Sequence, residues 1–310
     1  MRNAIKLIAV ILTALIFSGC SDPTALGNRA IIQAAAIDYD DGYKISALMF
    51  ISGGSGGDTR DASPENVIKV QGKGKTLSEA VDNISLVDGK RIYMCETKLL
   101  ILGSGFEDAD ISDALDTLYY DLRCSLNMPV CYSENAEMLT DLQFTEGVTA
   151  AEKPLSVIEN ASKLGVFPKT TLLDLMADRA GGRPSLIPMF GLTQNGRGMT
   201  LSDDGNTAVL SGSRVLSAGR LTERYDRDTT TGLMLINGIT DKIMLNYFCR
   251  GSEKTCEAYS IKVTQDDPGA GGSGLRITAK FRSRNGTALT EDERRAALVK
   301  LTEIVENGIV

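Results

Sequence analysis

The sequence predicts an α+β protein of two parts: mixed sheets with packed helices first, then a β-rich α+β domain that ends in a helix. Short apolar runs typical of strands are mixed with apolar residues at helical spacing as far as Gly182. Beyond Arg183-Pro184 most runs are strand-like and are separated by turn sequences. The last segment has the pattern of an amphipathic helix. We therefore expect an N-terminal domain over 29–195 and a C-terminal domain over 196–310.

The first predicted element is a β-hairpin. Apolar, β-compatible runs cover 29–37 and 43–51, and the segment between them ends in Asp41-Gly42. An Asp-Gly pair between two such runs is a strong hairpin signal. Asp38, Asp40 and Asp41 are not followed by the remaining ligands and terminal glutamate of a calcium loop, so a solvated turn is expected.

A strand and a capped helix are predicted next. A loop rich in Gly, Ser and Asp runs from 53 to 64 and precedes a strand-like run over 66–71. The segment 72–76 is similar to a phosphate-binding loop, but Lys69 stands where the first glycine is required. Thr76 and Glu79 instead predict a helix that starts with a capping box. The apolar residues at helical spacing in this helix are Leu77, Ala80, Val81 and Ile84.

Three further helices are predicted before Arg183-Pro184, where the mostly strand-like part begins. A strand over 91–102, interrupted by polar residues at 95–98, separates them from the first helix. Asp110 is the expected cap of a helix over 111–122. The other two helices cover about 154–164 and 170–180, and Gly181-Gly182 ends the last one. We expect their apolar faces to form the core.

The C-terminal part contains five strand-like runs, at 207–217, 232–236, 243–249, 258–264 and 275–281. Thr290 and Glu293 form a second predicted capping box, which starts the final helix, and Gly308 ends it. The residues expected to face inward from this helix are Ala297, Leu298, Leu301, Ile304 and Val305.

The N-terminus has the layout of a lipoprotein signal. Arg2 and Lys6 precede an apolar run over 7–17 that is too short for a stable membrane span, and Ser18-Gly19-Cys20 completes a lipobox. We expect a signal peptide over 1–19, cleavage between Gly19 and Cys20, a diacylglyceryl group on Cys20, and a tether over 20–28. The alternative is an ordinary cysteine after a cleaved signal or short anchor. Eight residues reach roughly 25–30 Å at most, so the body is expected to lie near the bilayer.

The composition excludes several kinds of active site. The chain has no histidine, which removes Ser-His-Asp and Cys-His arrangements and most zinc sites. It has no tryptophan and only 5% aromatic residues, so base- or sugar-stacking platforms are not expected. Loss of Arg2 and Lys6 with the signal changes the net charge from −7 to −9, which argues against nucleic-acid binding. We expect a protein without catalytic activity, cofactor or metal.

Five cysteines remain for the folded body, in a compartment where disulfides are permitted. Cys249 and Cys256 flank a polar segment, 250–255, that predicts a hairpin loop, so a bridge across two strands is one possibility. Cys124 and Cys131 have the same spacing and are the second candidate pair. Cys95 is expected to be a buried free thiol. Neither pair has the spacing of a zinc site.

Four stretches, in order behind the lipobox, carry a family resemblance. They are 26–45, which includes Leu26-Gly27-Asn28-Arg29; 74–81 with 91–103; Leu118-Tyr119-Tyr120-Asp121-Leu122-Arg123; and 209–222 with Thr231-Gly232-Leu233. Together they resemble the Ger(x)C family of spore-germination lipoproteins. Ser21 stands where the family usually has an aromatic residue, and the sequence stops at Val310, before the family's further strands. A shortened C-terminal domain is therefore expected.

The resemblance implies a subunit of a spore germinant receptor. Such a subunit is held in the lipid bilayer through Cys20, on the outer face of the spore's inner membrane, beside two integral membrane subunits. The family implies a scaffold or coupling role without catalysis or cofactor.

Two other functions remain open at this stage. The first is a solute-binding lipoprotein of an importer, although its usual form requires alternating βα units in both halves. The second is a hydrolase that uses paired carboxylates, either Glu134 with Glu137 or Asp226 with Asp228. Both pairs lie in polar stretches, where solvated charge is the simpler interpretation.

Overall fold

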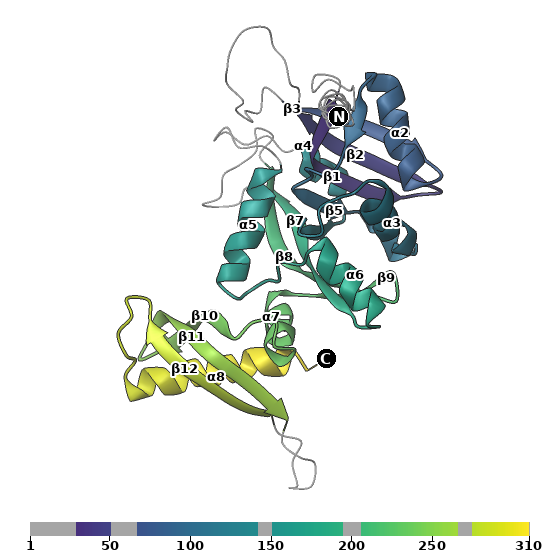
Figure 1. The fold of residues 1–310 in the computed structure, drawn as a ribbon. Helices are drawn as coiled ribbons and strands as arrows, with labels where there is room; N and C mark the ends of the chain where they lie inside the picture. The colour runs from purple at the N-terminus through teal and green to yellow at the C-terminus, as the bar shows by residue number, and fades with distance from the viewer. Residues whose placement is uncertain (1–28, 51–66, 142–150, 195–205, 266–274, 310) are drawn as a thin grey trace, which may run out of the picture.

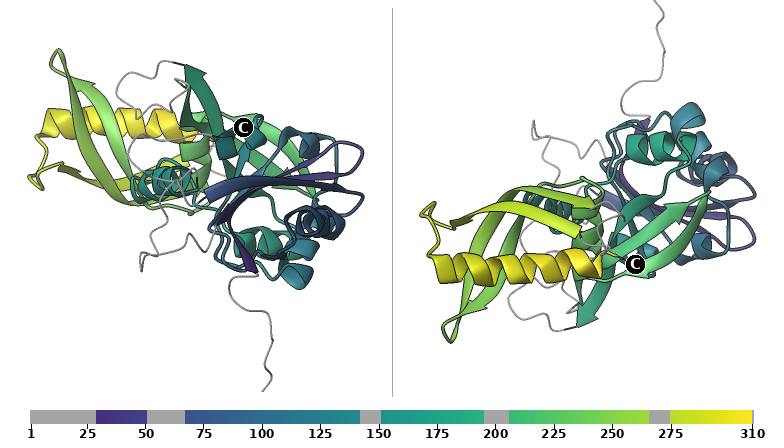
Figure 2. Two further views of the ribbon diagram at one scale, coloured as in Figure 1. Left: turned by 90° about the horizontal axis from the view of Figure 1, so that it is seen from above. Right: turned by 90° about the horizontal axis from the view of Figure 1, so that it is seen from below.

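The computed structural model describes residues 29–50, 67–141, 151–194, 206–265 and 275–309. These residues form a nine-stranded mixed sheet with helices on both faces, followed by a three-stranded antiparallel sheet with the long helix α8 against it (Figure 1). The predicted α+β class is confirmed. Figure 2 shows the two sheets side by side, with α8 lying along the smaller one.

The large sheet has the strand order β3-β2-β1-β5-β6-β7-β8-β9, and β4 also pairs with β1. Its central pairs, from β1 to β7 by way of β5 and β6, are parallel, and the pairs at both ends are antiparallel. The strands are β1 (Arg29–Tyr39), β2 (Tyr43–Phe50), β3 (Val67–Gly74), β4 (Arg91–Tyr93), β5 (Leu99–Leu102), β6 (Val130–Ser133), β7 (Ser185–Gln194), β8 (Asn206–Ser217) and β9 (Arg220–Tyr225).

Helices cover both faces of this sheet. The elements are α2 (Leu77–Asp88), η3 (Ser104–Glu107), α3 (Ser112–Asp116), the π-helical turn η4 (Thr117–Asp121), α4 (Ala136–Asp141), α5 (Glu152–Lys163) and α6 (Leu172–Ala180). One core cluster joins the sheet to α2, α3 and α6, and a second joins the opposite face to α4 and α5. The predicted helix over 111–122 is therefore divided, because its second half is wound as a π-helix.

The hairpin at the start of the described chain is confirmed. Tyr39 pairs with Tyr43, and the turn places Asp41 at φ 50° and Gly42 at φ 140°. An Asp-Gly pair tolerates these positive φ values better than other residues do. The register shifts at Gln33, where an extra residue forms a bulge in β1.

The interrupted strand over 91–102 is also confirmed. Its two halves, β4 and β5, both pair in parallel with β1. Between them, Lys98 N–H donates to the Gln33 carbonyl at 2.7 Å, which ties the break to the bulge of β1. The sheet thus continues across the polar interruption.

Helix α2 begins as predicted, with one change in its cap. Glu79 N–H donates to the Thr76 hydroxyl, but the Glu79 carboxylate accepts from Lys75 N–H at 2.7 Å rather than from Thr76. Gly72 lies in β3 under this helix: a Cβ there would be 2.0 Å from the Ala80 carbonyl oxygen. The glycines of the segment 72–76 therefore permit close packing of helix on strand, and they do not form a phosphate loop.

The smaller sheet has the order β10-β11-β12 and packs on α7 and α8. These elements are α7 (Arg227–Ile236), β10 (Lys242–Cys249), β11 (Ser252–Gln265), β12 (Leu275–Ser283) and α8 (Glu291–Asn307). The capping box of Thr290 and Glu293 is present. Ala297, Leu301, Ile304 and Val305 face the core as predicted, whereas Leu298 is exposed.

One sequence prediction in this region is wrong. The run 232–236 is the second half of α7, because Asp226 caps a helix there and accepts from Thr229 N–H at 2.8 Å. The expected domain boundary between 195 and 196 lies outside the described residues, between the strands β7 and β8, which pair with each other. The large sheet extends to Tyr225, so the structural division comes at α7.

Candidate functional site

The predicted lipidation and cleavage site, Gly19 and Cys20, lies outside the described residues, as do the tether over 20–28 and the predicted loop over 53–64. Each of them remains a prediction. The structure does describe the other candidate residues, which are the five remaining cysteines and the two carboxylate pairs.

The register of the small sheet separates Cys249 from Cys256. Cys249 is opposite Ser252, whereas Cys256 is opposite Leu245, four positions further along β11. At about 3.3 Å per residue this offset is roughly 13 Å, and disulfides need Cα atoms within about 7 Å. The turn is made by Arg250 and Gly251 alone, so the predicted loop over 250–255 is wrong and the two thiols are free.

Cys124 and Cys131 are also free, and they contribute to different core clusters on the two faces of the large sheet. Burial raises the pKa of Cys124 to about 12 and that of Cys256 to about 11. These thiols are therefore protonated at neutral pH and poor nucleophiles. Cys95 is free but exposed, which corrects the expectation that it is buried.

The paired carboxylates form ion pairs and a helix cap. Glu134 pairs with Arg224, and Glu137 pairs with Lys69 at 2.9 Å. The hydrogen bond from Lys69 lowers the pKa of Glu137, and backbone and side-chain bonds from Thr229 lower the pKa of Asp226. A general acid for glycoside hydrolysis requires a raised pKa, so neither residue is suited to that role. The fourth carboxylate, Asp228, is 3.8 Å from Lys300.

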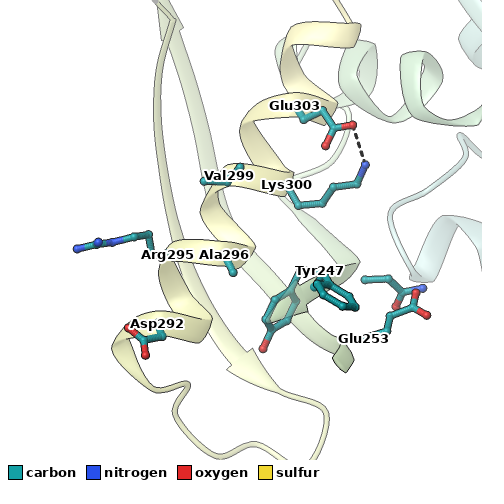
Figure 3. Close-up of a pocket in the computed structure, with 10 residues that line it drawn as sticks. Tyr247, Glu253, Asp292, Arg295, Ala296, Val299, Lys300 and Glu303 are labelled. Carbon is teal, nitrogen blue, oxygen red and sulfur yellow. Dashed lines mark ion pairs between the residues drawn. The ribbon is translucent and has the colours of Figure 1, made fainter. Parts of the chain in front are cut away.

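A groove of about 760 Å³ lies between α8 and the edge strand β10 in the smaller unit (Figure 3). Two apolar side chains line it while remaining in solvent: Phe248 is 69% exposed and Val299 is 65% exposed. We call this surface the α8–β10 groove. Its lining residues are Asn246, Tyr247, Phe248, Glu253, Asp292, Arg295, Ala296, Val299, Lys300 and Glu303.

Ion pairs hold the walls of the α8–β10 groove. Lys300 is 3.1 Å from Glu303, and Lys254 is 2.6 Å from Glu293 at the start of α8. The hydrogen bonds from Lys254 and Thr290 lower the pKa of Glu293 to about 2. Tyr247 lies at the groove floor, and burial raises its pKa to about 12. The groove therefore combines two exposed apolar side chains with charged residues of both signs, among them the ion-paired Lys300 and Glu303.

The edge strand β10 beside this groove has backbone N–H and C=O groups on the side that faces away from β11. β10 pairs with β11 on one side only, and near its start Met244 N–H donates to the Leu164 carbonyl at 3.1 Å. The later residues Asn246 and Phe248 border the groove. An edge strand beside an apolar strip can accept an extended peptide, which pairs with the backbone and buries alternate side chains.

A second cleft, of about 920 Å³, lies where α6, β9 and α7 meet. Asp178 on its wall accepts from Arg183 at 3.0 Å and from Ser185 at 2.7 Å. Glu223, also on the wall, has a lowered pKa because the Thr222 hydroxyl donates to it. The carboxylates of Asp178 and Glu223 therefore accept hydrogen bonds from other residues of the protein. The cleft lies next to α7, where the large sheet ends and the smaller unit begins.

A buried polar cluster lies near this edge of the large sheet. The Arg214 guanidinium is 2.8 Å from Glu107 and lies over the Tyr132 ring at 5.1 Å. The Tyr132 hydroxyl donates to Glu107, and burial raises the pKa of Tyr132. One guanidinium nitrogen, Nε, has no hydrogen-bond partner. The cluster joins η3, β6 and β8 across the sheet.

Sequence reasoning did not identify the α8–β10 groove or the Arg214 cluster. A signal for the groove was present, because the alternation along 243–249 places Phe248 on the same side as Asn246, away from the core. Arg214 gives no such signal, since its partners Glu107 and Tyr132 are distant in sequence.

No helix within the described ranges is both long and apolar enough to cross a membrane. Within the same ranges, no three residues among His, Cys, Asp and Glu are grouped so that they could hold a metal ion. The fold and its grooves are those of an α+β protein with surfaces suited to association.

Comparison with known proteins identifies the family. The family model described as "Spore germination protein N-terminal domain" matches residues 22–192, which is more than half of the chain. Spore germination protein KC of Bacillus subtilis (strain 168) is 22% identical over 286 residues, covering 86% of this chain and 69% of that protein. The crystal structure of the GerBC protein is similar with a TM-score of 0.46 and 14% identity, over 88% of this chain and 79% of that one.

The chain belongs to the GerAC/GerKC family of spore germination proteins. The resemblance found in the sequence is thereby confirmed. These comparisons indicate no enzyme family.

Proposed function

We propose that the protein is a lipid-anchored, non-catalytic subunit of a spore germinant receptor. In this role it acts as a scaffold or coupling element beside two integral membrane subunits, on the outer face of the spore's inner membrane. The observation that carries the proposal is the family match over residues 22–192. The match covers most of the large sheet, so the family fold is the main body of the protein.

The lipobox supports the membrane attachment. It leaves eight residues between Cys20 and Arg29, where β1 begins. Two or three acyl chains hold a protein firmly, since each buried methylene contributes about 0.8 kcal/mol. An anchor of this kind would keep the large sheet near the bilayer.

The α8–β10 groove supports the scaffold role. Its exposed Phe248 and Val299 lie beside the edge strand β10, and two of its charged residues, Lys300 and Glu303, pair with each other. Such a surface suits a protein segment better than a small charged ligand, because backbone pairing and apolar contact supply the binding energy.

The test is affinity purification of the tagged protein, extracted from membranes of sporulating cells, followed by mass spectrometry. We expect two polytopic membrane subunits to co-purify, and to be lost or much reduced with Cys20→Ala. Recovery of importer permease and ATPase subunits would instead favour the solute-binding alternative. Absence of any membrane partner with the wild-type protein would contradict the receptor assignment.

A further inference from the structure

The end of α2 exposes two adjacent aliphatic side chains. Leu86 is 81% exposed and Val87 is 89% exposed, more than any other large apolar residue among those described. The core-facing side of α2 is complete without them, since Leu77, Ala80, Val81 and Ile84 are buried. Leu86 and Val87 therefore contribute little to the fold of the protein itself.

Leu86 and Val87 lie close to the point where the predicted tether joins the folded body. After α2, Gly89 forms a left-handed cap and β4 begins at Arg91, whose ladder partner is Arg29. Paired strands lie about 4.8 Å apart, so the segment 86–91 turns beside the point where the tether joins β1. Only eight residues separate Arg29 from Cys20.

The charges of this segment suit a lipid headgroup region. Lys90 and Arg91 are basic, and the Arg91 guanidinium lies over the Tyr93 ring at 5.5 Å. The segment's one acid, Asp88, is half-buried and has one carboxylate oxygen out of contact with solvent. Aliphatic residues flanked by basic and aromatic side chains are typical of surfaces that lie in a membrane interface.

We infer that residues 86–91, the α2–β4 tip, dock on the phospholipid bilayer, with Leu86 and Val87 in the acyl-chain boundary and Lys90 and Arg91 at the lipid phosphates. The inference rests on the proposed lipid anchor, which brings the tip within reach. α2 lies at the opposite end of the molecule from β10–β12 and α8 (Figures 1 and 2). Docking through the tip therefore leaves α8 and β10, which line the α8–β10 groove, at the end of the molecule far from the lipid.

The absence of tryptophan from the sequence makes a direct test possible. Val87→Trp places a single tryptophan in the tip, and Val299→Trp places one at another exposed aliphatic position, on α8. The full chain, produced with its signal so that Cys20 is processed, is mixed with phosphatidylcholine vesicles containing phosphatidylglycerol and with the same vesicles carrying brominated acyl chains. A flotation assay measures separately how much of the protein is attached to the vesicles.

We expect Val87→Trp emission to shift to shorter wavelength on vesicles and to be quenched by the brominated chains, while Val299→Trp shows neither effect. Adding Leu86→Asp to Val87→Trp should abolish the shift while flotation persists. If the protein floats but Val87→Trp emission stays as in buffer, the tip does not dock and the inference is overturned.

Failure of flotation would instead count against the lipid anchor. In that case Val87→Trp is titrated with excess vesicles. A shift there still supports docking through the tip, and unchanged emission overturns it.

Discussion

Arg214 shows how the large sheet accommodates a buried charge. Its side chain is only 10% exposed, yet it lies over the Tyr132 ring and pairs with Glu107. Arg224 pairs with Glu134, and both of these side chains are about half exposed. The two arginines lie on adjacent strands, opposite each other in the ladder, so they form a natural comparison.

We expect Arg214→Ala to lower the free energy of unfolding by about 1–3 kcal/mol, because it leaves Glu107 without its cation and removes contacts from Tyr132. Arg224→Ala should cost less than about 1 kcal/mol, as exposed pairs do. Urea denaturation of the two variants measures both. Equal losses would show that the Arg214 cluster is no more important than a surface pair.

The cysteines give a second prediction at the scale of single residues. The described thiols are free, and Cys95 is exposed whereas Cys131 is fully buried. A thiol reagent should therefore modify Cys95 in the native protein and reach Cys124, Cys131, Cys249 and Cys256 only on unfolding. Mass mapping under non-reducing conditions checks this order. A Cys249–Cys256 peptide cross-link in native material would contradict the register of β10 and β11.

At the scale of elements, α7 and α8 meet backbone to backbone. A Cβ on Gly232 would lie 2.2 Å from the Ile304 carbonyl oxygen and 2.7 Å from Gly308 N. Gly232→Ala must therefore force the helices apart, and we expect it to destabilise the protein by about 1–3 kcal/mol. Gly181→Ala is the control, since the nearest atom is at 3.4 Å and its effect should stay within about 0.5 kcal/mol. Thermal unfolding of both variants tests the contact.

The cap of α8 makes stability depend on pH in an acid window. Glu293 has a folded pKa of about 2, against an ordinary value of 4.5, chiefly because Lys254 donates to it. The unfolded chain takes up the proton first as the pH falls, so stability is complete above about pH 4.5 and declines towards pH 2.

Glu293→Gln should remove this contribution and flatten the pH dependence of unfolding between pH 4.5 and 2. Urea midpoints measured across that window compare the two proteins. Identical slopes for wild type and Glu293→Gln would mean that the pKa of Glu293 is the same in the folded and the unfolded protein.

Elements whose signal is local were predicted well, and those that depend on distant partners were not. The Asp41-Gly42 turn and the α8 capping box are each specified within a few residues. The run 232–236 contains apolar residues that suit a strand, but the cap at Asp226 and the packing of Gly232 on α8 make it helical. The place of β8 and β9 in the large sheet likewise depends on distant partners, because only strand pairing shows that they complete it.

For the whole molecule, the candidate surfaces were the least predictable feature. The sequence indicated the family and an anchor, but the α8–β10 groove exists only once α8 lies along β10. Leu298 shows the limit of periodicity: the same helical stripe that correctly places Leu301 inward leaves its neighbour exposed. Three-dimensional packing decides which apolar residues remain free for a partner.

A last prediction concerns the whole receptor assembly. Phe248→Asp with Val299→Asp should reduce co-purification of membrane partners without loss of stability, because both side chains are exposed. Leu173→Asp, an exposed aliphatic position on α6, is the matched control. Quantitative mass spectrometry of the purified complexes makes the comparison. Unchanged partner recovery would exclude the groove as a receptor contact.

The place of β1 within the sheet has a mechanical consequence. The described chain begins at Arg29, and β1 is flanked by β2 on one edge and by β4 and β5 on the other. A pull applied at Arg29 acts along this strand, nearly perpendicular to the hydrogen bonds of its antiparallel partner. Those bonds are sheared together and do not peel apart singly, so the body joins its N-terminal tether at a strong point of the fold.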